Sequence, residues 1–283
     1  MDKIVAFFLL TAIAAAAWAT QPERLVVGVF PYLTTRTLVN TYQPLRMHLE
    51  QSLAREVAVV TAPDLRQFYA RSQRGDYDIL VTPPHFARLH QLQSGLIPLF
   101  GYSNPTTGLL VARRDSGIKS AEDLRGREIA IAEPVALVAI MCAAWMGQHG
   151  MKSPRDYTFH VAGSHNSAVM SVVNRETAAA VVGASAFKQI TEKFKSDVVV
   201  VTAVGEVMGL VVLANPRLGS GLAQIEQSLA SFPSTPEGQQ FIQTNGIGGF
   251  KPIERSELQK LDPYLPETTR WLKDIEQFRL PMP

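Results

Sequence analysis

The sequence predicts an α/β protein built from two lobes, and two observations carry this prediction. Short β-branched or apolar runs alternate with longer amphipathic runs, which is typical of parallel strands separated by helices. The alternation restarts near residue 108, and no linker rich in Gly or Ser separates the two units. We therefore expect two lobes, each a mostly parallel sheet flanked by helices, joined by two crossing segments that act as a hinge.

The first unit contains four apolar runs and the amphipathic segments between them. The runs that predict strands are 25–30, 57–61, 79–81 and 97–102. Leu38, Tyr42 and Leu45 recur at helical spacing, which predicts a helix over 38–53. Asp64 is the expected N-cap of the next helix, because a short acidic side chain accepts a hydrogen bond from a free backbone N–H there.

The second unit repeats the pattern and is followed by a mainly helical end. We expect strands at 108–113, 128–132, 157–161 and 179–182, and helices at 120–124, 135–149, 164–175 and 184–193. Runs at 198–202 and 209–214 predict strands that return, and the chain after Pro216 is mainly helical. Because strand-to-helix loops gather at one edge of a parallel sheet, a ligand is expected in a cleft between the units.

The N-terminus has the pattern of a secretory signal peptide over residues 1–19. A lysine precedes a short apolar run, and Ala17-Trp18-Ala19 places small residues where a signal peptidase reads them, so cleavage is expected before Thr20. An uncleaved anchor is the alternative. No later segment is apolar enough over sufficient length to span a membrane. We expect an exported protein.

Composition excludes several classes of function. The 283 residues are 46% hydrophobic and 18% charged, which indicates a globular chain, and a net charge of +2 without a basic run argues against nucleic-acid binding. The single cysteine, Cys142, precludes an intramolecular disulfide and lies in an apolar helical segment, where core filling is expected and a reactive thiol is the alternative.

No pattern of catalytic or metal-ligating residues stands out. The chain lacks G-x-S-x-G, H-E-x-x-H and a Gly-rich phosphate loop, so we do not expect an enzyme or a cofactor. His85 and His165 come from different lobes and could meet, but neither belongs to an H-x-H or H-x-x-x-H pair, so no metal site is expected.

Several short motifs together carry a family resemblance. They are Tyr42-Gln43-Pro44-Leu45, Gly75-Asp76-Tyr77-Asp78-Ile79, Pro84-His85-Phe86, Ser116-Gly117-Ile118, Asp123-Leu124-Arg125-Gly126 and Gly163-Ser164-His165. Across 24–215 the chain resembles the phosphate/phosphite/phosphonate solute-binding family of periplasmic proteins. The resemblance implies a type II periplasmic binding protein, with one lobe formed by 24–107 and 208–283 and the other by 108–207.

The resemblance implies a periplasmic receptor that captures a small polar or anionic solute by hinge closure and delivers it to an ABC importer. We expect it to act as a monomer. Pro84-His85-Phe86 also resembles the variant of this domain in the sensing regions of some histidine kinases. A sensory receptor that presents its bound state to such a kinase is therefore the alternative, and a purely structural role ranks third.

The ligand itself stays open because the chain departs from the family pattern. Relatives that bind phosphonates carry a Ser/Thr-rich turn where this chain has Glu133-Pro134-Val135-Ala136-Leu137. Glu133 would repel a phosphonate if it faced the cleft, and Pro134 removes a backbone donor. Asn166 and alanines stand where relatives commonly place acids that receive a ligand amine.

Candidate contacts follow from the loops after strands. In the first lobe we expect Tyr32, His85, Phe86, Tyr102 and Ser103 to face the cleft. In the second lobe we expect Val135, Ala136, Ser164, His165, Asn166 and Ser185. Ser164 could instead serve only as an N-cap, and Tyr32 only as a loop aromatic packed on proline.

Overall fold

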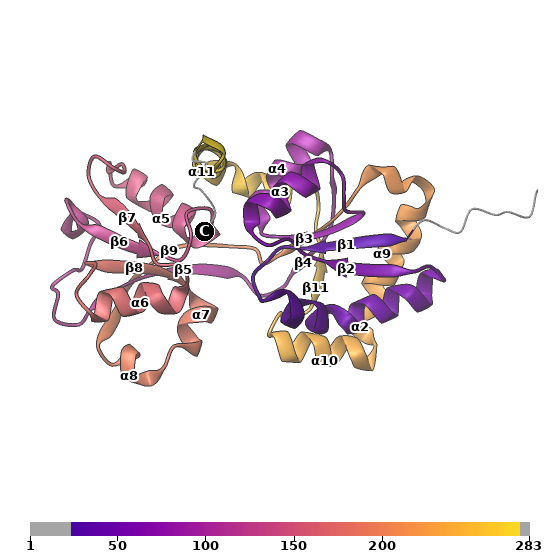
Figure 1. Ribbon diagram of the computed structural model, residues 1–283, viewed down its shortest axis with the longest axis horizontal. Coiled ribbons are helices and arrows are strands. Elements are labelled where there is room, and N and C mark those ends of the chain that lie inside the picture. The colour runs from indigo at the N-terminus through magenta and orange to yellow at the C-terminus, as the bar shows by residue number, and fades with distance from the viewer. Residues whose placement is uncertain (1–23, 278–283) are drawn as a thin grey trace, which may run out of the picture.

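Two lobes lie side by side along the long axis of the molecule (Figure 1). The computed structural model describes residues 24–277, so the predicted signal peptide and its cleavage site lie outside the described residues. Within that range no helix combines the length and the apolar character that a membrane span requires.

Lobe 1 contains a six-stranded sheet in the order β11-β4-β10-β3-β1-β2. Its strands are β1 (Leu25–Val29), β2 (Val57–Val60), β3 (Ile79–Thr82), β4 (Ile97–Tyr102), β10 (Val211–Ala214) and β11 (Phe250–Pro252). Helices α2 (Thr35–Leu53), α9 (Leu222–Ser231) and α10 (Pro236–Asn245) cover one face, and α3 (Leu65–Gln73) and α4 (Pro84–Ser94) cover the other.

Lobe 2 contains a five-stranded sheet in the order β7-β6-β8-β5-β9. Its strands are β5 (Thr106–Arg113), β6 (Glu128–Ile131), β7 (Thr158–Val161), β8 (Ala179–Gly183) and β9 (Val198–Val207). A short 3-10 turn, Glu122–Leu124, precedes β6. Helix α5 (Leu137–Gln148) covers one face, and α6 (His165–Val173), α7 (Ala184–Gln189) and α8 (Glu192–Lys195) cover the other.

Each sheet contains three neighbouring strands that pair in parallel, as expected, and its remaining pairings are antiparallel, including those of the strand by which the chain enters from the other lobe. β1 pairs in parallel with β2 and β3, whereas β10 runs antiparallel to both β3 and β4. In lobe 2, β6 pairs in parallel with β7 and β8, whereas β5 runs antiparallel to β8 and β9. The crossing segments β4-to-β5 and β9-to-β10 therefore each enter a sheet through an antiparallel strand.

The two crossing segments, 103–105 and 208–210, touch through their backbones. The Tyr102 N–H donates to the Leu210 carbonyl over 2.8 Å. A Cβ added to Gly209 would meet the carbonyl oxygen of Asn104 and would lie 2.8 Å from that of Tyr102. Glycine is therefore favoured at 209, because a side chain would push the two segments apart.

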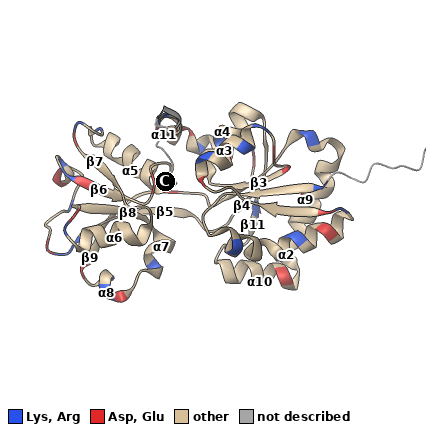
Figure 2. Ribbon diagram, viewed as in Figure 1, with Lys and Arg blue, Asp and Glu red and all other residues tan. Residues whose placement is uncertain are grey.

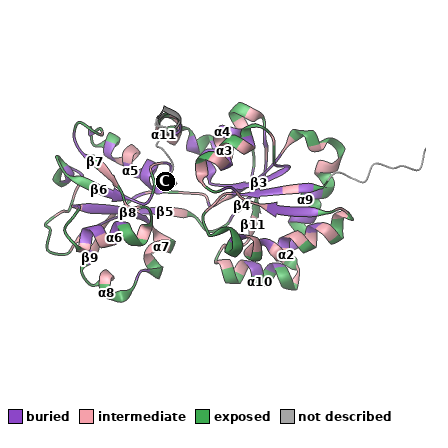
Figure 3. Ribbon diagram, viewed as in Figure 1, coloured by how far each residue is buried: buried purple, intermediate pink, exposed green. Residues whose placement is uncertain are grey.

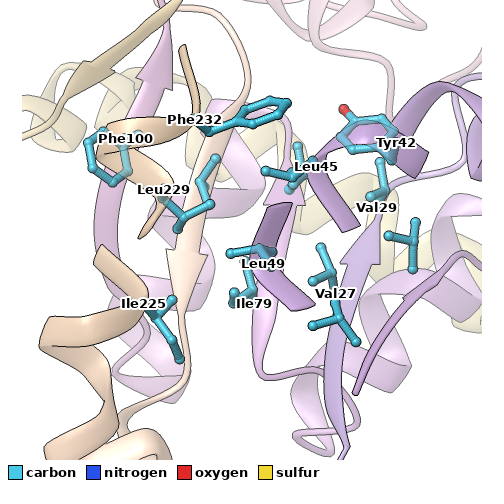
Figure 4. Close-up of a cluster of buried hydrophobic side chains, with 14 of the residues drawn as sticks. Val27, Val29, Tyr42, Leu45, Leu49, Ile79, Phe100, Ile225, Leu229 and Phe232 are labelled. Carbon is cyan, nitrogen blue, oxygen red and sulfur yellow. The ribbon is translucent and has the colours of Figure 1, made fainter. Parts of the chain in front are cut away.

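Burial is concentrated on the inner strands of both lobes and on the helix faces that pack against them (Figure 3). In lobe 1, Tyr42, Leu45 and Leu49 project from α2 toward β1 and α9, in agreement with the predicted helical spacing (Figure 4). In lobe 2, Cys142 is fully buried, and burial raises the pKa of its thiol to about 12, so it is protonated at neutral pH. The expectation of a core cysteine is confirmed.

The C-terminal segment reaches from lobe 1 to lobe 2. A 3-10 segment, Glu257–Tyr264, packs on α4, and α11 (Leu265–Gln277) continues from it to contact α5. Leu272 of α11 packs in one apolar cluster with Phe86 and Leu89 of α4 and with Val135 of lobe 2. We call this group of four residues the interlobe cluster.

The structure differs from the sequence predictions at 184–193 and at β11. The helix expected over 184–193 is broken, because Ile190 adopts an extended conformation and buries its side chain between α7 and α8. The edge strand β11 was not predicted, since it contains only three residues and exists through its pairing with β4.

Candidate ligand-binding cleft

A cavity of about 480 Å³ lies between the lobes and is lined by residues from both. Lobe 1 contributes the loops that follow β1, β2 and β3, and lobe 2 contributes the loops that follow β6, β7 and β8. Thr106 and Leu210 of the crossing region complete the wall. The cavity therefore occupies the carboxyl edge of the sheets, as the order of strands and helices predicts.

Four helices of at least two turns begin at this cavity. Their N-caps are Asp64 for α3, Pro83 for α4, Ala136 for α5 and Ser164 for α6, and all four residues line it. The first N–H groups of a helix have no partner within the helix, and the helix dipole places partial positive charge there. The convergence of these N-termini favours a negatively charged group in the cavity.

Helices α5 and α6 contain no charged residue and appear entirely tan in Figure 2. At the start of α6, the Ser164 hydroxyl accepts a hydrogen bond from the Ser167 N–H over 3.0 Å, so Ser164 is an N-cap as well as a lining residue. Positive potential on the lobe 2 wall therefore comes from backbone N–H groups, not from lysine or arginine.

A row of tyrosine hydroxyls leads from the cavity into lobe 1. Tyr32 lines the cavity, is 40% exposed and stacks on Phe30 with ring centroids 4.8 Å apart. Its hydroxyl donates to Tyr42 over 3.4 Å, and Tyr42 shares a 2.9 Å hydrogen bond with Tyr102. Burial raises the pKa of all three phenols, so they remain neutral hydrogen-bonding groups.

The ionisable side chains on the cavity wall are acidic or neutral. Asp64 of lobe 1 and Glu133 of lobe 2 both line it, and among its described lining residues there is no Lys or Arg. Desolvation, followed by the charge of Asp64, raises the pKa of Glu133. Desolvation lowers the pKa of His165, which favours the neutral imidazole, and its buried Nδ1 has no hydrogen-bond partner among the described residues.

The structure brings five of the predicted contacts together in this cavity: Tyr32, Val135, Ala136, Ser164 and His165. A smaller adjoining cavity of about 180 Å³ shares Tyr32, Thr106 and Leu210 with it and is lined also by Tyr102 and Ser185. Ser103 lies at a third cavity, of about 290 Å³, beside the crossing segments. Asn166 is exposed on α6 outside the lining.

His85 and Phe86 occupy the interior rather than the cavity wall. His85 is fully buried, and its Nε2 donates to the carbonyl oxygen of Val135 in lobe 2 over 3.2 Å. Phe86 belongs to the interlobe cluster. The prolines that precede them, Pro83 and Pro84, line the cavity instead, because the first turn of α4 directs the two following side chains inward.

The sequence predicts a capping role for Asp64, and the structure shows that Asp64 also lines the cavity. Its Oδ1 accepts from the Gln67 N–H over 2.7 Å, as expected of an N-cap. A signal for its second role was present, since Asp64 follows β2 at the same edge where the other strand-to-helix loops end. The rule that placed the other strand-to-helix loops at the cleft therefore applies to the loop after β2 as well.

Comparison with known proteins gives a consistent result. A family model described as the periplasmic substrate-binding protein of a phosphonate ABC transporter matches residues 27–258. The structure of XAC2383 from Xanthomonas citri bound to ATP is similar at a TM-score of 0.76 and 18% identity, covering 89% of this chain and 98% of that one. The structure of PhnD1 from Prochlorococcus marinus in complex with methylphosphonate is similar at a TM-score of 0.71 and 15% identity, and the match covers 89% of this chain and 99% of that one. The structure of a histidine kinase sensor domain with similarity to periplasmic binding proteins is similar at a TM-score of 0.55 and 16% identity, and the match covers 82% of this chain and 99% of that one.

Proposed function

Because the chain belongs to the family of periplasmic substrate-binding proteins of phosphonate ABC transporters, we propose that it captures a small solute with an anionic group between its lobes and delivers it to an ABC importer. The lobes would close around the solute by bending at the two crossing segments. We also propose that the protein acts as a monomer. The proposed lobe boundaries are those that the sequence predicts, with 24–107 and 208–283 in lobe 1 and 108–207 in lobe 2.

The observation that carries the proposal is the convergence of four helix N-termini, two from each lobe, on one cavity. An anion placed there interacts with both lobes at once, so its binding energy favours the closed arrangement. Tyr32, Val135, Ala136, Ser164 and His165 are the proposed contacts. Tyr102 and Ser185 would be reached only by a longer ligand that extends into the adjoining cavity.

A receptor that reports its bound state to a histidine kinase is the alternative. The likeness to a kinase sensor domain supports it at the level of fold, and the chemistry of the cleft would be the same in both roles. Co-purification with a permease or with a membrane kinase after crosslinking separates the two. Recovery of a kinase without a permease would favour the sensory role.

A thermal-shift screen of the chain from Thr20 onward tests ligand capture. The panel contains phosphate, phosphite, alkylphosphonates, sulfonates, amino acids and small carboxylates. A ligand present at about 100 times its Kd stabilises the folded state by about 2.7 kcal/mol, which is a readily measured rise in Tm. If no compound in the panel raises Tm, the proposal is contradicted.

A matched pair of histidine variants then locates the binding. His165→Ala removes a lining side chain and is expected to weaken the ligand-induced shift, whereas His160→Ala, on β7 away from the cavity, is expected to leave it unchanged. Both variants are first compared without ligand to show that they fold. An equal ligand shift in both variants would place the binding site elsewhere.

A further inference from the structure

The row of three tyrosine hydroxyls starts at the cavity wall and ends beside the crossing segments. Tyr32 lines the cavity and is 40% exposed, whereas Tyr42 is fully buried and Tyr102 is 5% exposed. Tyr102 is the last residue of β4, and the crossing segment 103–105 follows it directly. The row therefore connects a wall of the cleft with the start of the hinge.

The rings of the two inner tyrosines are held in place by their neighbours. The Tyr42 ring meets Phe241 edge-on with centroids 5.4 Å apart, and the Tyr102 ring stacks on Phe250 with centroids 5.3 Å apart. The Tyr102 backbone is fixed as well, because its N–H donates to the Leu210 carbonyl. The two inner hydroxyls therefore occupy defined positions, 2.9 Å apart, behind the wall of the main cavity.

The row has more protons than internal hydrogen bonds. A phenol hydroxyl donates one hydrogen bond and can also accept. Burial raises the pKa of all three phenols, so each keeps its proton at neutral pH. Three protons are thus available for the two hydrogen bonds between the hydroxyls. One proton has no acceptor within the row.

The direction of the row decides where this proton lies. When Tyr32 donates inward to Tyr42, the proton belongs to Tyr42 or Tyr102, and neither hydroxyl has another partner among residues 24–277. An unused buried donor is unfavourable. When Tyr102 donates to Tyr42 and Tyr42 donates to Tyr32, the proton lies on Tyr32 at the cavity. The inward bond from Tyr32 is long, at 3.4 Å, so little hydrogen-bond energy opposes the outward direction.

We propose that Tyr42 and Tyr102 are positioning residues, which turn the row outward so that Tyr32 donates its proton to the anionic group of the solute. The proposal rests on the function proposed above and deepens it. An anion accepts hydrogen bonds and has no proton to give, so its contact with Tyr32 selects the outward direction. Each hydroxyl then polarises the next, which strengthens the donor at the cavity. Tyr42 acts only through Tyr32, since it is fully buried and does not line the cavity.

Removal of one hydroxyl at a time tests the row. Isothermal titration at neutral pH measures the Kd of methylphosphonate, ethanesulfonate and propionate for the chain and for three variants that keep the ring. The expected rise in Kd is about tenfold or more for Tyr32→Phe, about three- to tenfold for Tyr42→Phe and about twofold for Tyr102→Phe. Tyr157→Phe removes a phenol hydroxyl from a buried position in lobe 2 outside the row and is expected to leave Kd unchanged.

A double variant separates positioning from a structural role. If Tyr42 acts through Tyr32, then Tyr42→Phe adds nothing once the Tyr32 hydroxyl is gone. Tyr32→Phe combined with Tyr42→Phe is therefore expected to have the Kd of Tyr32→Phe alone. A hydroxyl that only supported the fold of lobe 1 would raise Kd a second time. Tm without ligand checks that each variant folds.

The outcomes separate this inference from the function on which it rests. Unchanged binding in Tyr32→Phe or in Tyr42→Phe, or additive losses in the double variant, would overturn the proposed role of the row and leave solute capture standing. Failure of all three anions to bind would also overturn it. Solute capture itself then depends on the broader panel, and both proposals fail only if no compound there raises Tm.

Discussion

The lobes are connected at two places of opposite character. At the crossing segments the connection is covalent, and backbone lies against backbone where Gly209 approaches Asn104 and Tyr102. At the interlobe cluster the connection consists of side chains, with Phe86 and Leu272 packed against Val135 and with His85 bonded to the Val135 carbonyl. The first connection persists in every arrangement of the lobes, whereas the second can separate.

This difference indicates which residues set the balance between open and closed forms. Bending at the crossing segments changes backbone angles but loses little buried area. Separation of the interlobe cluster exposes apolar surface and breaks the hydrogen bond between His85 and the Val135 carbonyl, both of which oppose opening. We therefore expect substitutions in the interlobe cluster to shift the equilibrium between the open and closed forms. Substitutions in the crossing segments are expected to affect the formation of the hinge itself.

The largest expected effect is that of Phe86→Ala. Phe86 is 1% exposed, and truncation of a buried phenylalanine typically costs about 3–5 kcal/mol through lost transfer energy and the cavity left behind. Urea denaturation measures the loss of stability, and small-angle scattering measures the radius of gyration, which is expected to rise without ligand. A stable variant with an unchanged radius would show that the cluster does not hold the lobes together.

Low pH is expected to weaken the contact between the lobes at the interlobe cluster through protonation of His85. Burial lowers its pKa from 6.5 to about 4, so between these values the unfolded chain binds a proton that the folded chain does not. The free energy of unfolding therefore decreases as the pH falls through this window, by about 3 kcal/mol for this residue. The added proton would sit on Nδ1, which has no acceptor among the described residues.

His90 provides the control, since burial also lowers its pKa to about 4 but its partner Ser72 lies within lobe 1. His85→Gln and His90→Gln are each expected to flatten the pH dependence measured by denaturation. Only His85→Gln should also reduce the acid-induced rise in radius of gyration. Equal effects of both variants on the radius would argue against an interlobe role for His85.

The smallest expected effect on stability is that of Gly209→Ala, at about 1–3 kcal/mol, because the new methyl group overlaps the backbone of the other crossing segment. Its functional consequence should be larger than its stability cost, since displaced crossing segments misalign the two walls of the cleft. Ligand titration measures this as a rise in Kd. Gly147→Ala, on α5 with open space around the added Cβ, is the matched control.

Much of the fold is predictable because its signals are local. The apolar run at 97–102 coincides with β4, and the capping roles of Asp64 and Ser164 follow from their side chains alone. Features that depend on distant partners were not predictable. β11 forms a strand only because β4 offers it an edge, and Ile190 ends α7 because the core of lobe 2 accepts its side chain.

The same distinction applies to the candidate cleft. Position after a strand predicts that Tyr32, Val135 and His165 lie near one another, and the structure brings them to one cavity. Position after a strand cannot predict that the His85 side chain turns inward, because that orientation depends on the Val135 carbonyl group in the other lobe. The contact between lobes, unlike the loop order within each lobe, leaves no periodic trace in the sequence.

The position of β10 has a consequence for the order in which the molecule can be made. β10 lies between β3 and β4 and pairs with both, although the whole of lobe 2 precedes it in the chain. Until β10 has been synthesised, a nascent chain thus carries β3 with one unpaired edge and β4 with no strand partner, because the other neighbour of β4, β11, comes later still. Lobe 1, the first to be started, is therefore among the last parts to be finished.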